Sequence, residues 1–141
     1  MKPLGYLLMQ GSVILFIASS TADILLTFVF GGILPSHLAY LELHAHIAVT
    51  PQIETLNLAM VRTIGALFLA IGLAGQVILY ELVRTGHKRG PLYLVSILSV
   101  GVIMYTLLMS EIQTPHYFAP LLSLALLLLG SALWRNTKSM G

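Results

Sequence analysis

The chain has 141 residues, of which 57% are hydrophobic and only 9% are charged. Soluble domains carry roughly 25% charged residues, so seven basic and five acidic side chains cannot cover the surface of a soluble globule of this size. This composition excludes a free cytosolic enzyme, a disordered chain and a nucleic-acid binder, which needs a basic patch. The absence of cysteine excludes disulfides, thiolate metal sites and cysteine nucleophiles. We therefore expect an integral membrane protein.

Four apolar segments are long enough to cross a bilayer as helices, which takes about 20 mostly apolar residues. They cover approximately residues 6–33, 58–83, 92–109 and 117–134. Glycine and proline occur between these segments, where helices end and begin. The prediction is an all-α, four-helix transmembrane bundle in which residues 1–141 form a single membrane domain and residues 34–57 form a long outer loop.

The basic residues indicate which way the bundle is oriented. Six of the seven lie before the first span, between the second and third spans, or after the fourth. These six are Lys2, Arg84, Lys88, Arg89, Arg135 and Lys138. Because loops rich in lysine and arginine stay on the cytoplasmic side, both termini are expected in the cytoplasm and the loop 34–57 outside.

Two charged residues fall inside the spans, Asp23 in the first and Arg62 in the second. Ionisable side chains are costly in the hydrocarbon region and usually pair or take part in function. Asp23 lies roughly 15 Å and Arg62 roughly 9 Å from the outer ends of their helices, a difference that a long arginine side chain can cover. We therefore expect an intramembrane ion pair between Asp23 and Arg62. A proton or anion site at the same pair is the functional alternative.

Small and polar residues recur at steps of three or four positions in each span, as they do where membrane helices pack closely. We expect these stripes to face a common bundle core, and a polar conduit along them is the alternative. The glycines expected at helix contacts are Gly65, Gly72 and Gly130. The stripe of the third span consists of Ser96, Ser99, Ile103, Thr106 and Ser110.

The outer loop carries a histidine-rich stretch in which apolar residues alternate with Glu42, His44 and His46. A period of two is typical of a strand, on which these three side chains would share one face and could hold zinc, copper or non-haem iron. On an interfacial amphipathic helix, the shared face would instead belong to His37, Tyr40 and His44. The leading interpretation is a segment that caps the bundle or meets a partner. Other outer groups that could complete a metal site are Glu54, Glu111 and His116.

The second span contains the stretch Arg62-Thr-Ile-Gly65-Ala-Leu-Phe-Leu-Ala-Ile-Gly72-Leu. An arginine before a glycine-rich helix resembles the second-helix pattern of the DoxX-like small four-helix bacterial membrane proteins. The resemblance covers this motif and the four-span layout, whereas the histidine-bearing outer loop is not part of the pattern. It implies a four-helix fold in the bacterial cytoplasmic membrane. Some members of that family are similar to subunits or partners of membrane redox enzymes.

The leading functional hypothesis is a non-catalytic accessory or assembly subunit of a larger membrane complex. The connections are too short for a catalytic domain, and the spans hold no catalytic constellation. Expected partners are other membrane subunits and bilayer lipid, with no nucleic acid. One alternative is a small oligomeric transporter or ion-coupled carrier that uses Asp23 and Arg62. A second is a metal-assisted membrane enzyme that uses Glu42, His44 and His46. The cofactor is unknown from the sequence, apart from a possible metal ion at the outer loop and bound lipid.

Overall fold

The computed structural model describes residues 2–29, 31–111 and 118–136 of the chain. Its four long helices are α1 (Lys2–Val29), α3 (Pro51–Ile78), α4 (Gly90–Glu111) and α5 (Phe118–Asn136). Each is long and apolar enough to cross a membrane, and no strand occurs in the described ranges. The predicted all-α fold with four membrane-spanning helices is confirmed at this level. The side of the membrane on which the termini lie stays a prediction.

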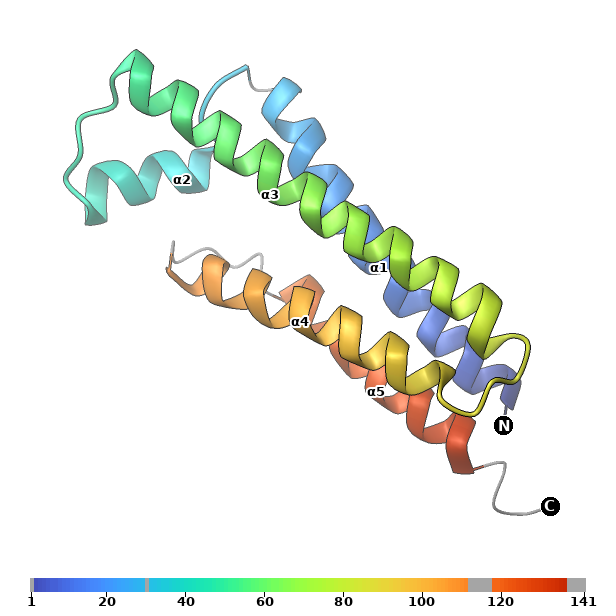
Figure 1. Ribbon diagram of the computed structural model, residues 1–141. Helices are drawn as coiled ribbons and strands as arrows, with labels where there is room; N and C mark the ends of the chain where they lie inside the picture. Colours follow the sequence, from blue (N-terminus) through green and yellow to red (C-terminus); the bar gives the residue numbers. More distant parts are fainter. Residues whose placement is uncertain (1, 30, 112–117, 137–141) are drawn as a thin grey trace.

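The four long helices form a bundle with α1 and α4 on one diagonal and α3 and α5 on the other. Helix α1 packs against α3 and α5, and α4 packs against the same two helices. The start of α1 and the end of α5 lie at one end of the bundle, which we call the termini end (Figure 1). The short helix α2 (Pro35–Ala39) lies at the opposite end, which we call the α2 end.

Apolar side chains fill the middle of the bundle and also cover its outside. Met9, Phe16 and Leu127 are buried between the helices. Leu67 and Leu129, by contrast, are more than half exposed. Apolar residues on the outer surface suit a protein whose helices are surrounded by lipid, because lipid exacts no cost for exposing them.

Helix α3 begins at Pro51, seven residues before the start expected from hydropathy. Thr50 adopts an extended conformation, and its side chain accepts a hydrogen bond of 3.3 Å from the backbone N–H of Ile53. Proline at the first helical position is favoured because its missing N–H would have no helical partner there. The outer loop is therefore shorter than predicted, and Asn57 belongs to α3.

The segment that was expected to be either a strand or a helix is helical. Helix α2 continues into a π-helical turn, η1 (Tyr40–His44), in which the N–H of Ala45 donates to the carbonyl of Tyr40 at 2.9 Å. The rings of Tyr40 and His44 lie 6.0 Å apart, as expected for the helical alternative. The strand alternative is wrong for Glu42 and His44, because side chains two residues apart on a helix point in different directions.

The buried face of α4 differs from the expected stripe. Its buried residues include Leu94, Leu98, Val102 and Tyr105, which recur at steps of three or four positions. The serine-containing stripe falls on other faces, since Ser96, Ile103 and Ser110 are exposed and Ser99 and Thr106 are partly buried. The expectation was wrong because α4 is apolar on all sides, so its small polar residues do not indicate which face is buried.

Helices α1 and α5 approach each other closely near the termini end. A Cβ atom added to Gly130 would lie 2.7 Å from the carbonyl oxygen of Gly5 and 2.9 Å from the backbone nitrogen of Met9. Similar additions at Gly65 and Gly72 would lie 2.7 Å from side-chain atoms of Ile24 and Ile17. All three glycines therefore lie at contacts with α1, and at Gly130 the contact is with backbone.

Candidate functional site

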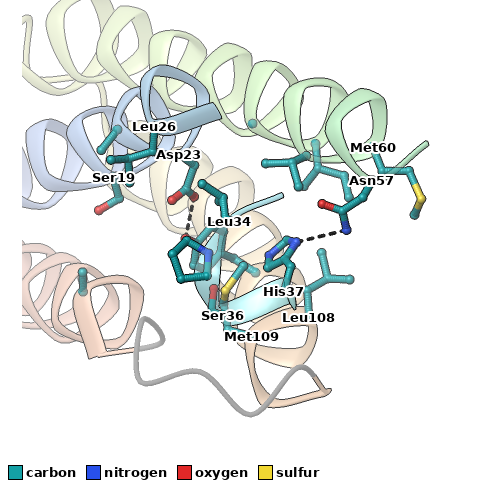
Figure 2. A pocket seen from close by; sticks show the side chains of 17 residues that line it. Ser19, Asp23, Leu26, Leu34, Ser36, His37, Asn57, Met60, Leu108 and Met109 are labelled. Carbon is teal, nitrogen blue, oxygen red and sulfur yellow. Dashed lines mark hydrogen bonds between the residues drawn. The ribbon is translucent and has the colours of Figure 1, made fainter. Parts of the chain in front are cut away.

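A cavity of about 620 Å³ opens between α1, α2, α3 and α4 at the α2 end (Figure 2). Most of its wall is apolar, including Leu26, Met60 and Met109. The polar residues that line it are Ser19, Asp23, Ser36, His37, Asn57 and Tyr105. A hollow of roughly 300–1,000 Å³ with apolar walls and a few polar groups is typical of small-molecule sites.

Asp23 extends from α1 to this cavity and is bound there by a residue of α4. The hydroxyl of Tyr105 donates a hydrogen bond of 2.6 Å to Oδ2 of Asp23. Tyr105 is itself almost completely buried, and its ring packs edge-on against Phe68 with the ring centroids 5.2 Å apart. A fixed aromatic ring thus sets the position of the tyrosine hydroxyl and, through it, the position of the carboxylate.

A second polar pair lines the cavity on the side of α2 and α3. Nδ2 of Asn57 and Nδ1 of His37 lie 3.3 Å apart (Figure 2). This contact ties the short helix α2 to the first turns of α3. The other end of the Asn57 amide, Oδ1, is buried and has no hydrogen-bond partner among the residues that the structure describes. A buried amide oxygen without a partner costs stability.

Arg62 makes contacts that differ from the expected ion pair with Asp23. Its Nε donates a hydrogen bond of 3.1 Å to Oγ1 of Thr27, and its guanidinium lies 4.3 Å from the centre of the Phe28 ring. Thr27 is fully buried and in turn donates to the carbonyl of Ile24 at 2.7 Å. Arg62 therefore joins α3 to the end of α1, and it is not among the described residues that line the cavity.

The predicted metal ligands do not come together in the described part of the chain. Glu42 and His44 lie on the π-helical turn, while His46 follows it with a positive φ of 53°. All three side chains are exposed. No group of three or more histidine, aspartate or glutamate residues with a metal-binding arrangement occurs among the described residues. His116 lies outside them.

Sequence reasoning identified Asp23 but missed its partner Tyr105 and the pair formed by His37 and Asn57. A tyrosine in a long apolar helix is indistinguishable from an ordinary core residue. Asn57 stood at the predicted boundary of the second span, and the capping signal of Thr50 and Pro51 could have moved that boundary outward.

Comparison with protein families, with curated proteins and with solved structures found no match.

Proposed function

We propose that the protein is a membrane-embedded binding protein for a small lipophilic organic cation with N–H donors, of the kind an amine carries. The observation that carries the proposal is the Asp23 carboxylate on the wall of a largely apolar cavity of about 620 Å³. The proposal develops the carrier hypothesis of the sequence, with Asp23 in the binding role and Arg62 in a structural one.

The charge of the cavity supports a cation. Asp23 is the one acidic residue among the described lining residues, and these include no lysine or arginine. Electrostatic attraction is stronger across apolar surroundings than across water. A carboxylate has about four acceptor positions, so Asp23 can accept hydrogen bonds from more than one donor.

The second polar pair supports a ligand with a further polar group. Asn57 holds His37 with one end of its amide, and the other end is buried without a partner among the described residues. A ligand that spans the cavity from Asp23 to Asn57 would place a polar group beside Asn57, and the apolar walls between the two residues would cover its hydrocarbon part. Ethidium, a lipophilic aromatic cation with amino groups, has these properties and is fluorescent.

The test is a fluorescence titration of ethidium with the full chain in lipid nanodiscs. We expect saturable binding, and Asp23→Asn should weaken it at least tenfold because the isosteric amide removes the charge. Glu81→Gln is the matched control, since Glu81 is an exposed carboxylate of the same chain outside the cavity. Nile red, a neutral dye of comparable size, should not distinguish the variants.

Two results would contradict the proposal. One is an absence of saturable ethidium binding to the wild type, and the other is equal affinity of the wild type and Asp23→Asn. If the wild type also leaves native membranes in mild detergent with stoichiometric partner proteins, the role as an accessory subunit becomes the better hypothesis.

A further inference from the structure

A second hollow, of about 720 Å³, lies at the termini end of the bundle and is separate from the cavity at Asp23. It is an open groove between α1 and the end of α3, where α3 continues into a second π-helical turn, η2 (Leu79–Val83). Its lining residues include Tyr6, Leu7, Gln10, Gln76, Tyr80 and Arg84. We call it the termini-end groove. The proposed cation site has no residue in common with it.

Two glutamines place amide groups in this groove within the apolar part of the bundle. Nε2 of Gln10 donates a hydrogen bond of 2.9 Å to Oε1 of Gln76, which joins α1 to α3. The amide nitrogen of Gln76 has no acceptor among the described residues, and the groove leaves it accessible. A bilayer offers such a donor the ester carbonyls of a lipid.

A positively charged residue, Arg84, lies about two helical turns beyond Gln76 along the same groove. The guanidinium of Arg84 lies over the ring of Tyr80, 4.7 Å from its centre. Because Tyr80 precedes Arg84 by one turn, this contact folds the arginine side chain back along the helix toward Gln76. Eight residues separate Gln76 from Arg84, about 12 Å along a helix, and the folded side chain shortens that separation.

The surroundings of Arg84 are basic. Lys88 and Arg89 follow in the exposed turn between η2 and α4, whereas Glu81 is the one acidic residue of residues 79–93. This charge attracts an anion and repels the quaternary amine of a zwitterionic headgroup. Arginine is suited to phosphate because its planar guanidinium can donate two parallel hydrogen bonds to one group.

We propose that the termini-end groove binds one anionic glycerophospholipid. Its phosphate meets Arg84, an ester carbonyl accepts a hydrogen bond from the amide nitrogen of Gln76, and an acyl chain lies along the exposed Leu7. A phosphate ester is the shared chemistry of a lipid headgroup and free phosphate. The pairing of Arg84 with Gln76 favours the lipid, because free phosphate reaches one of these groups and has no use for the apolar wall.

The test is native mass spectrometry of the full chain released from nanodiscs that contain equal amounts of phosphatidylglycerol and phosphatidylcholine. We expect the wild type to retain one phosphatidylglycerol at least fivefold more often than one phosphatidylcholine. Arg84→Gln should abolish this preference, and Gln76→Leu should lower retention of both lipids. Arg135→Gln is the matched control, because Arg135 is an exposed arginine of the same end outside the groove.

Three results would overturn the proposal. The first is equal retention of the two lipids by the wild type. The second is an equal loss of preference in Arg84→Gln and Arg135→Gln, which would indicate diffuse attraction by the basic surface. The third is displacement of phosphatidylglycerol by millimolar inorganic phosphate, which would identify a phosphate site instead. Arg84 is exposed and joins no two helices, so its variant tests the site even if Gln76→Leu disturbs folding.

Discussion

Tyr105 donates a hydrogen bond of 2.6 Å to Asp23 and thereby connects α4 to α1, the two helices on one diagonal of the bundle. Neighbouring helices are joined by apolar contacts and by polar pairs such as Gln10 and Gln76, and this diagonal too is bridged by polar atoms, at the cavity. The carboxylate that the sequence assigned to an arginine partner is therefore positioned by a buried hydroxyl.

Tyr105→Phe should destabilise the protein by about 1–2 kcal/mol, because it removes one hydrogen bond to a carboxylate and leaves the ring packing intact. Unfolding monitored by circular dichroism in detergent measures this loss. The coupling can be isolated by a double-mutant cycle with Asp23→Asn, in which the two losses should not add. Strict additivity of the two variants would show that the hydroxyl and the carboxylate do not interact.

Gly130→Ala should destabilise the bundle by about 1–3 kcal/mol, the usual cost of overpacking. The new methyl group would meet the backbone of Gly5 and Met9, which cannot move aside as a flexible side chain can. Gly11→Ala is the control on the same pair of helices, because a Cβ there would meet nothing within 4 Å. Thermal unfolding should separate the two variants, with Gly11→Ala as stable as the wild type or more so. Equal melting temperatures would contradict the close approach of α1 and α5.

The number of helices long and apolar enough to span a membrane could be predicted, because a bilayer requires long apolar segments. The start of α3 was missed because hydropathy does not detect the polar first turns, although Thr50 and Pro51 form a recognisable helix start. The buried face of α4 could not be predicted, because apolar residues occur on all sides of this helix and serve equally well against lipid and in the core. Packing partners determine which face is buried, and they lie elsewhere in the sequence.

Of the polar residues that line the candidate cavity, the charged one, Asp23, was the one predicted as a functional residue. Asp23 is conspicuous because charges are rare in spanning helices. Tyr105, His37 and Asn57 join it through the tertiary arrangement of α4, α2 and α3, which residue spacing does not contain. The alternation of apolar and polar residues around Glu42 and His44 wrongly indicated a strand, since the helix that begins at Pro35 continues to His44 as a π-helical turn.

Ser123→Ala should be more destabilising than Ser12→Ala. The hydroxyl of Ser123 donates to the carbonyl of Ser12 at 3.0 Å, and the two serine hydroxyls also lie 3.0 Å apart. Removal of the Ser123 hydroxyl therefore breaks both contacts between α1 and α5, whereas removal of the Ser12 hydroxyl breaks one. Each contact is expected to contribute about 0.6 kcal/mol. Ser96→Ala, at an exposed position of α4, serves as the control and should leave stability unchanged.

Arg62 and Thr27 should be energetically coupled, whereas Arg62 and Asp23 should not. Arg62→Gln and Thr27→Val each remove the 3.1 Å hydrogen bond between the two side chains. Their combined loss of stability should therefore be smaller than the sum by about 0.5–1.5 kcal/mol. In the parallel cycle, Arg62→Gln and Asp23→Asn should add, because the guanidinium contacts Thr27 and Phe28. Unfolding free energies of the three single and two double variants decide between these contacts and the ion pair expected from the sequence. If Arg62 were coupled to Asp23 and not to Thr27, the ion pair expected from the sequence would be correct. Arg62 would then compete with a bound cation for the carboxylate.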